Sequence, residues 1–194
     1  MKKLFTLIIL TIGFTVSAQI ATSGTTNSGT NASAIGYQTS ATNTVSTAMG
    51  RETLASGVTS TAMGYQTSAT NTASTAIGNN STASGITSTA IGNNSTASGE
   101  TSIAMGFETE ATHSASLAMG YQTSSTEGAS SAMGFKTTAS GFGSTSIGYE
   151  TVASGNSSTA MGWLTTANGK ASIAMGKSTI ASDFGSLVIG QYNL

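Results

Sequence analysis

The chain has 194 residues, of which 24 are Gly, none is Pro or Cys, and only 7% are charged. Soluble domains average about 25% charged residues and about 5% Pro, so this is not the composition of an ordinary mixed globule. A formal net charge of -1 leaves no basic patch of the kind that nucleic-acid binding uses. Because the chain has no Cys and a single His, His113, we expect no disulfide, no metal site and no cofactor.

The first 18 residues have the pattern of a secretory signal peptide. Lys2 and Lys3 supply the positive region, an apolar run extends from Leu4 to Val16, and Ala18 ends a small-residue cleavage site. The run is shorter than the ~20 residues that cross a bilayer, and no second apolar stretch follows. We therefore predict cleavage after Ala18 and a secreted mature chain without a transmembrane segment. An uncleaved membrane anchor is the alternative.

After a Ser/Thr/Gly-rich lead-in over 19–27, a single repeat organises residues 28–194. A triplet of Ala, then Ile or Met, then Gly recurs with minor variation at a spacing of 14 residues, with no insertion or deletion. A strict period of this kind is typical of a solenoid, in which each repeat is one coil stacked on the last. The twelve middle positions, which we predict to form the structural core of the repeat, are Ile35, Met49, Met63, Ile77, Ile91, Met105, Met119, Met133, Ile147, Met161, Met175 and Ile189.

Fourteen residues are too few for a two-helix repeat but suffice for two short strands and two tight turns. In Ser60 to Gly64, the alternation of a strand places Ser, Ala and Gly on one face and Thr and Met on the other. In Thr67 to Ala69, Thr and Ala share a face, and the residue between them varies and is expected to meet solvent. We predict a turn with positive φ at the column seven residues after the repeat glycine, which is rich in Gly and Asn. That column is Asn43, Gly57, Asn71, Gly85, Gly99, His113, Glu127, Gly141, Gly155, Gly169 and Asp183.

Both faces of the first strand carry a repeating pattern, yet only one can point into its own coil. The other face needs a partner, which predicts parallel homo-oligomers. Our preferred arrangement has Ile and Met inside the coil, against the second-strand Ala, and the Ser/Ala/Gly faces packed between protomers. The reverse arrangement is the alternative.

The full repeat pattern resembles that of a known protein family. The pattern Ser-x-Ala-Ile/Met-Gly, two variable residues, Thr-x-Ala-Ser/Thr-Gly, two variable residues and Ser is similar to the YadA-like head repeat of trimeric autotransporter adhesins, over about residues 28–194. The resemblance implies an all-β fold, a left-handed parallel β-roll solenoid of 14-residue coils, assembled as a side-by-side homotrimer. It also implies display at the bacterial cell surface in association with the outer membrane, and non-enzymatic attachment to host matrix proteins, glycans, cells or other surfaces.

Members of that family usually continue into a stalk and a membrane anchor. Neither a heptad pattern for a stalk nor a set of anchor strands follows these repeats. We expect a fragment, a head whose last coil is capped by a partner, or a secreted head that does not anchor itself.

Candidate binding residues lie in the column that directly follows the repeat glycine. It is rich in aromatic residues, which stacked coils would space by about 4.8 Å. An adhesive aromatic ladder is one interpretation, because exposed aromatic side chains are enriched at interfaces. Rings that cover the coil edge and stack on each other are the other interpretation. The aromatic residues are Tyr37, Tyr65, Phe107, Tyr121, Phe135, Tyr149 and Trp163.

Three further interpretations differ in class. An ice-binding solenoid is suggested by a Thr column, namely Thr39, Thr53, Thr67, Thr109, Thr123, Thr137, Thr151, Thr165 and Thr179. A fibre-type structural solenoid is a second non-enzymatic alternative. A hexapeptide-repeat acyltransferase is disfavoured, because the six-residue subperiod and a catalytic His column are absent. We predict no catalytic residues, since His113 occupies a turn position and no base stands beside the Ser columns.

Overall fold

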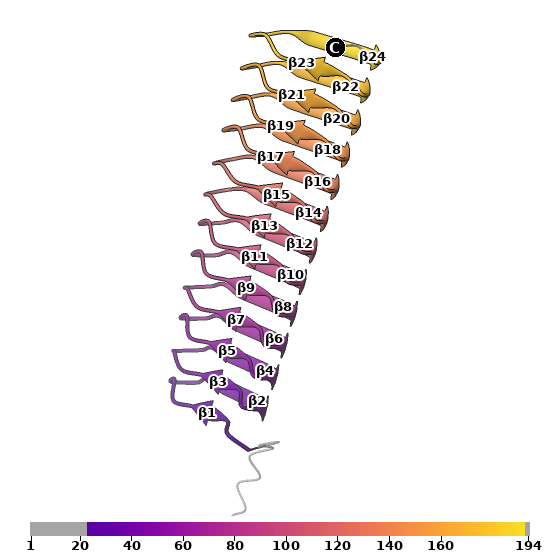
Figure 1. Ribbon diagram of the computed structural model, residues 1–194. Helices are drawn as coiled ribbons and strands as arrows, with labels where there is room; N and C mark the ends of the chain where they lie inside the picture. Colours follow the sequence, from indigo (N-terminus) through magenta and orange to yellow (C-terminus); the bar gives the residue numbers. More distant parts are fainter. Residues whose placement is uncertain (1–22, 193–194) are drawn as a thin grey trace, which may run out of the picture.

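The computed structural model describes residues 23–192, which form a rod of stacked coils (Figure 1). Each coil contributes one strand to each of two parallel 12-stranded sheets. The predicted all-β parallel solenoid of 14-residue coils is therefore confirmed. The predicted signal peptide lies outside the described residues.

Every complete coil contains one five-residue strand and one two-residue strand. The long strands are β2 Ser33–Tyr37, β4 Thr47–Arg51, β6 Thr61–Tyr65, β8 Thr75–Asn79, β10 Thr89–Asn93, β12 Ile103–Phe107, β14 Leu117–Tyr121, β16 Ser131–Phe135, β18 Thr145–Tyr149, β20 Thr159–Trp163, β22 Ile173–Lys177 and β24 Leu187–Gln191. The short strands are β1 Thr26–Asn27, β3 Ser40–Ala41, β5 Leu54–Ala55, β7 Ser68–Ala69, β9 Thr82–Ala83, β11 Thr96–Ala97, β13 Glu110–Ala111, β15 Ser124–Ser125, β17 Thr138–Ala139, β19 Val152–Ala153, β21 Thr166–Ala167 and β23 Ile180–Ala181.

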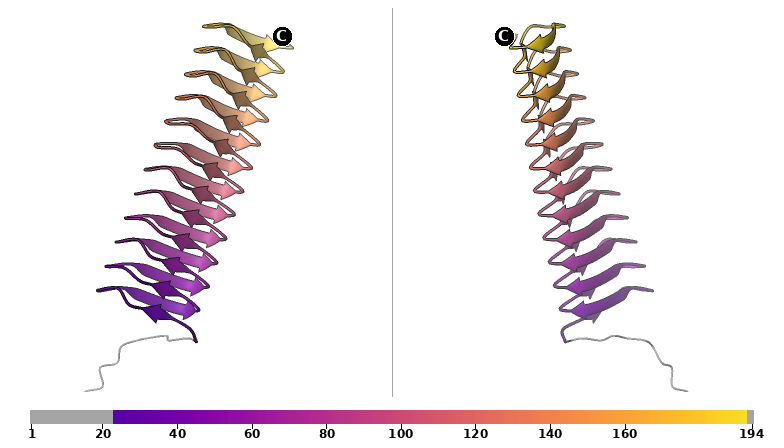
Figure 2. Two further views of the ribbon diagram at one scale, coloured as in Figure 1. Left: turned by 60° about the vertical axis from the view of Figure 1, so that its left-hand side comes forward. Right: turned by 90° about the vertical axis from the view of Figure 1, so that its right-hand side faces the viewer.

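The register of the sheets follows the sequence repeat without a slip. Ala90 pairs with Ala76 on one side and Ala104 on the other, and each repeat glycine pairs with the next. Identical positions thus form columns along the rod, and successive coils repeat the same outline in both views of Figure 2. The constant spacing of the sequence motif is the direct cause, because one inserted residue would turn each following side chain to the opposite face.

The interior of the rod is lined by small side chains. The Ala of the long strand and the Ala of the short strand are fully buried at 0% exposure through most coils, as Ala62 and Ala69 illustrate. Ser60 and Thr67 complete the same coil interior, with exposed fractions of 0% and 1%. The core of each coil is therefore built from Ala, Ser and Thr.

The preferred arrangement with Ile and Met inside the coil is wrong. Met63 neighbours the fully buried Ala62 on β6, so the strand alternation turns it to the outer face, where it is half-buried. Two strands joined by short turns leave only a thin interior, which Ala, Ser and Thr already fill. The larger Ile and Met side chains therefore lie on the outside of the rod, which is the reverse arrangement that the sequence left open.

The position of positive φ in the first turn was also predicted wrongly. It lies two residues beyond the Gly- and Asn-rich column, at residues such as Thr59 and Ala73, with φ of 56° and 54°. The turn runs from Gly57 to Ser60 and carries the positive φ at its third residue, as type II turns do. Ser60 closes it, because its backbone N–H and its Oγ both donate to the Gly57 carbonyl, at 3.2 and 2.7 Å.

The glycines of that column have a different function. A Cβ at Gly57 would lie 1.9 Å from the carbonyl oxygen of Asn71 in the next coil, so the glycine allows close stacking rather than positive φ. At Asn71 the side chain instead reaches along the rod, and its Nδ2 donates to the Ser84 carbonyl at 3.1 Å.

The second turn has its positive φ two residues after the repeat glycine, at Gln66 for example, with φ of 52°. Most coil-to-coil N–H groups point toward the next coil, as Ser68 N–H does toward Ser81. At both corners the direction is reversed, since Gln66 donates to Arg51 and Ala73 donates to Val58 in the preceding coil. Because of this reversal, the N–H groups at both corners still donate hydrogen bonds to a neighbouring coil. These hydrogen bonds hold even β-branched residues in left-handed conformations that they rarely adopt.

The repeat glycine is required by both conformation and space. At Gly92 φ is +130°, and a Cβ would lie 1.9 Å from the carbonyl oxygen of Gly106. Few L side chains tolerate that φ, and a backbone oxygen cannot move aside as the end of a side chain can.

We predict that Gly92→Ala lowers the free energy of unfolding by roughly 1–3 kcal/mol from backbone strain alone. The matched control is Gly143→Ala, because Gly143 has φ of +64° with nothing nearer its Cβ position than 3.9 Å, and Ala occupies the same turn position at Ala129. Chemical denaturation followed by circular dichroism measures both. Equal stability of the two variants would contradict the explanation.

Candidate functional site

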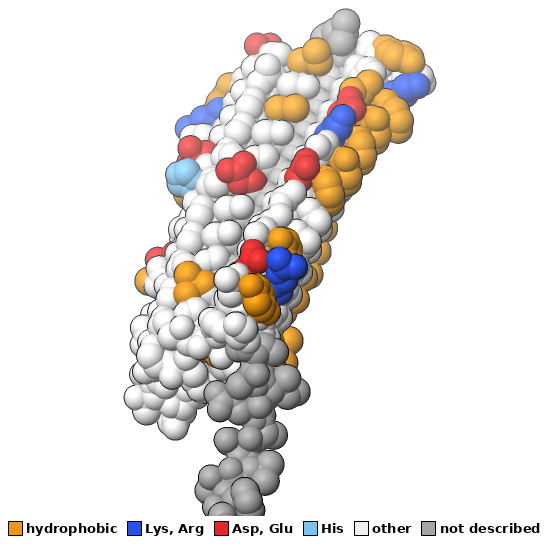
Figure 3. All heavy atoms as spheres, turned by 60° about the horizontal axis from the view of Figure 1, so that its bottom comes forward, with side chains coloured by type: hydrophobic (Ala, Val, Ile, Leu, Met, Phe, Trp, Pro, Cys, Tyr) orange, Lys and Arg blue, Asp and Glu red, His pale blue; other side chains and the backbone are white. Residues whose placement is uncertain are grey.

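The outer face of the long-strand sheet carries three parallel columns of side chains. The first contains Thr, Ser, Ile or Leu, as at Thr89 and Ile103; the second contains Ile or Met; the third directly follows the repeat glycine. Ile91 and Met105 are half-buried because the same column continues above and below them. No charged residue stands in the first two columns over the twelve long strands, so a continuous uncharged and largely apolar strip runs along the rod. Figure 3 shows hydrophobic side chains gathered in a band along the edge where the long strands end.

The third column forms a stack of five aromatic rings between Phe107 and Trp163. Neighbouring ring centroids are 4.9 Å apart from Phe107 to Tyr149 and 4.0 Å apart between Tyr149 and Trp163, with interplanar angles of 6° to 8°. The stacking expected from the sequence is therefore present. Because each inner ring has both faces covered by its neighbours, the stack offers mainly ring edges to a ligand. Whether it binds one stays a prediction.

The two remaining predicted aromatic residues do not join this stack. Tyr37 and Tyr65 lie on either side of Arg51, whose Cζ is 5.6 and 5.4 Å from their ring centroids. These distances are within the range of cation–π attraction, so a guanidinium replaces the ring at this level of the ladder. The sequence identified Tyr37 and Tyr65 as members of the aromatic column, but it did not indicate that they contact Arg51 instead of another ring.

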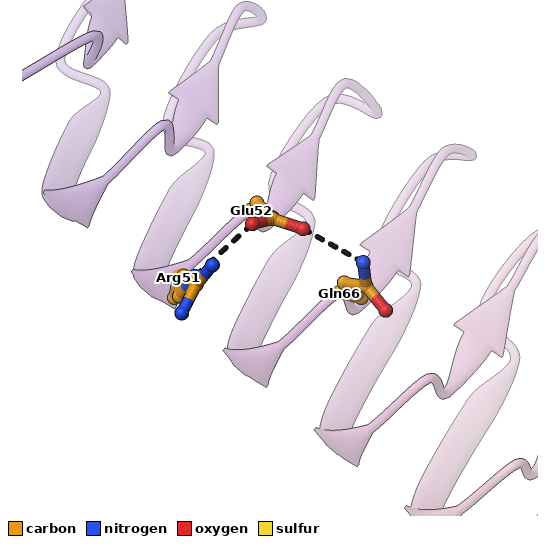
Figure 4. A network of polar contacts seen from close by, with 3 residues as sticks. All are labelled: Arg51, Glu52 and Gln66. Atoms are coloured by element: carbon orange, nitrogen blue, oxygen red, sulfur yellow. Dashed lines mark hydrogen bonds and ion pairs between the residues drawn. The ribbon is translucent and has the colours of Figure 1, made fainter.

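A small polar network continues from Arg51 (Figure 4). Arg51 Nε is 3.0 Å from Glu52 Oε1, and Gln66 Nε2 donates to Glu52 Oε2 at 2.7 Å. The hydrogen bond from Gln66, followed by that from Arg51, holds the pKa of Glu52 below its ordinary value. Since the whole network is at the surface, it links two coils without contributing a reactive group.

The outer face of the short-strand sheet carries hydroxyl groups in two columns. They flank the buried short-strand Ala, so that Ser68 and Thr70 both lie outside while Ala69 lies inside. The sequence predicted that the first of these columns meets solvent, and the second is the Ser/Thr position of the repeat pattern. We call this face the hydroxyl lattice; its residues are Thr26, Ser28, Ser40, Thr42, Ser56, Ser68, Thr70, Thr82, Ser84, Thr96, Ser98, Thr112, Ser124, Thr126, Thr138, Ser140, Ser154, Thr166 and Ser182.

The Thr column on which the ice-binding interpretation was based lies on the wrong side of the strand. Thr67 and its equivalents have exposed fractions of 0–1% and face the coil interior. Their methyl groups fill the core, and the Oγ1 atoms of Thr39, Thr53 and Thr67 have no hydrogen-bond partner there. These side chains cannot contact an external surface.

Within residues 23–192, no three His, Cys, Asp or Glu side chains are grouped in a way that could hold a metal ion. The same residues contain no helix that is long and apolar enough to cross a membrane. His113 is exposed at a turn, where its Nδ1 is 3.2 Å from Thr112 Oγ1.

We predict that Phe135→Ala, which removes two stacked pairs at ~0.5–1.5 kcal/mol each, lowers the free energy of unfolding by about 1–3 kcal/mol. Phe142→Ala is the control, because Phe142 is 59% exposed and belongs to none of the ring stacks in the described part of the chain. Its effect should stay within about 0.5 kcal/mol. Thermal and chemical denaturation measure both, and a larger effect at Phe142 would contradict the stacking argument.

We predict that Gln66→Ala raises the pKa of Glu52 toward its ordinary value, because it removes the largest cause of the lowering. A lowered pKa means that the network stabilises the fold above the ordinary pKa of Glu and loses that contribution as the pH falls through the folded value. Titration of the Glu52 carboxyl carbon by NMR measures the change. Ser68→Ala, which leaves the network intact, should not move the pKa. An unchanged pKa in Gln66→Ala would show that Gln66 is not the cause.

Comparison with known proteins gives a family for this chain. The family model described as the YadA head domain repeat matches residues 28–53, 55–81, 83–109, 139–165 and 167–193. A search of curated proteins found no match. The matched segments cover more than half of the chain and coincide with the stacked coils, so the chain belongs to the YadA head repeat family, an adhesin-type structural family.

Proposed function

We propose that this chain is the non-enzymatic head of a bacterial surface adhesin that works as a parallel homotrimer. The family supports this role, since it is typical of trimeric autotransporter adhesins. The single observation that favours assembly is the strip of Ile and Met on the outer face of the long strands. A continuous apolar surface of this length is unusual for a lone soluble chain and is typical of an interaction site.

The columns explain why the partner would be a copy of the same chain in parallel orientation. A rotational axis along the rod places each coil beside the same coil of the other protomers. Met119 would then meet Met119, and the uncharged strip would be buried along its whole length. Antiparallel packing would place dissimilar coils together and lose this match.

The remaining parts of the proposal follow from the same arrangement. Residues 1–18 would direct export, residues 19–27 would lead into the first coil, and residues 28–194 would be displayed at the cell surface in association with the outer membrane. Once the long-strand faces are covered, the aromatic edges and the hydroxyl lattice remain for contact with matrix proteins, glycans or other surfaces. The mature chain has four basic and seven acidic residues, a net charge of -3, which gives a nucleic acid no electrostatic attraction.

We predict that the mature chain has three times the mass of one protomer in solution and that Met119→Glu dissociates it. A carboxylate in the strip would be desolvated without a partner. Ser124→Glu, in the same coil but on the short-strand face, should remain trimeric, because Glu110 already occupies that column in the next coil down the rod. Sedimentation or light scattering measures the masses. A wild-type chain that is folded but monomeric at high concentration would overturn the proposal.

Attachment is tested with the same proteins. Beads coated with the wild-type head should adhere to at least one member of a panel of matrix proteins, glycans and mineral or plastic surfaces. Antibodies should label the head on intact cells of the source bacterium. Trimeric protein that adheres to nothing in the panel and is not accessible on intact cells would contradict the adhesin role.

A further inference from the structure

The hydroxyl lattice repeats in two dimensions. Along the rod its rows are separated by the strand spacing of about 4.8 Å. Along the chain its two columns are two residues apart, one in the short strand and the other directly after it. Both lattice positions carry a hydroxyl group in three consecutive coils. The pairs are Ser68 with Thr70, Thr82 with Ser84, and Thr96 with Ser98. The in-register ladder holds these side chains at fixed intervals.

The hydroxyl groups of the lattice point to the outside, and almost all of them have no intramolecular partner. Within the described part of the chain, only Thr112 among the lattice side chains has a hydrogen bond of its own, to His113. The others are therefore available to donate to and accept from whatever lies on this face. By contrast, the Ser column inside the rod is used to close the turns, as Ser60 does at Gly57.

The chemistry of the face limits the class of ligand. Its two columns contain one charged side chain, Glu110, and no aromatic ring across β1 to β23 and the residues that follow each short strand. A charged polymer would find no counter-charge there, and a sugar ring would find no aromatic platform. The regular in-register surface, broad and mostly without coloured side chains in Figure 3, does not enclose a small molecule as a pocket does.

We propose that the hydroxyl lattice binds ice crystals. A rigid two-dimensional array of hydrogen-bonding groups suits a ligand that is itself such an array, and waters bridging polar groups take their spacing from the groups that hold them. Rows of hydroxyl groups at a regular interval can hold an ordered layer of water, and an ice surface presents such a layer. Because the stacked coils order the backbone beforehand, only the rotamers of these short side chains remain to be ordered on binding.

This inference rests on the proposed attachment function and names one surface for it. In a trimer built on the long-strand strip, the hydroxyl lattice of each protomer would face outward. Four lattice positions are occupied by Leu54, Glu110, Val152 and Ile180, and one by Asn168. The contact would therefore be strongest over the uninterrupted coils from Ser68 to Ser98.

The test uses the mature wild-type chain, fluorescently labelled, with ice as the probe. The wild type should become incorporated into a growing ice hemisphere and should produce thermal hysteresis in an osmometer. The double variant Thr82→Lys/Thr96→Lys, which places two bulky cations in the uninterrupted rows, should lose both effects. The matched control Thr44→Lys/Thr72→Lys changes two exposed residues of the neighbouring turn column, where Lys170 already stands, and should retain both.

Circular dichroism and mass measurements on every protein ensure that a loss of ice binding is not a loss of folding. A folded wild type without ice affinity would overturn the inference, as would equal ice affinity in the lattice variant, or binding to crystalline cellulose or chitin instead of ice. If the wild type is trimeric and adheres to other surfaces but not to ice, the inference fails and the proposed adhesin function stands. If it is monomeric and adheres to nothing, the proposed function fails as well.

Discussion

The unbroken hydrogen-bond ladder between coils is the interaction on which the whole structure depends. A coil of 14 residues has a thin core, since its interior is filled by the small side chains of Ala, Ser and Thr. It cannot be stable alone, and each coil gains its stability from the coils above and below it. Both corners join this ladder by reversing the direction of one N–H group, as Gln66 and Ala73 illustrate. Such close stacking requires the repeat glycine, because any side chain there would collide with the next coil.

Much of the fold could be predicted from the sequence, because register needs only a constant period. The number of coils, the two strands per coil and the parallel sheets follow from twelve equally spaced motifs. The direction of the strand faces could not be predicted in the same way. Alternation shows that Ala62 and Met63 point to opposite sides, but which side is inside depends on the width of the coil, and that is set by the turns. Placing Met inside assumed an ordinary hydrophobic core, whereas the coil is too thin for one.

In the turns and the candidate site too, some features could be predicted from the sequence pattern and others depend on the three-dimensional structure. A Gly- and Asn-rich column suggested positive φ, yet at Gly57 the glycine serves close approach and the positive φ falls at Thr59. Ring stacking between Phe107 and Trp163 could be predicted, because equal positions in consecutive coils must lie one above another. The cation–π arrangement of Arg51 could not, since it depends on side-chain conformations. Solvent exposure of the first hydroxyl column could be predicted from its variability. That the Ser/Thr position after the buried Ala lies on the same outer face could not, since it depends on the course of the chain beyond the short strand.

Because every coil repeats the same backbone and the same columns, the length of the rod is a modular property. Duplication or loss of one 14-residue unit would move the tip by about 4.8 Å and leave every other contact unchanged. The rod could therefore become longer or shorter with the number of repeats, and every coil would keep the packing interactions that it has now.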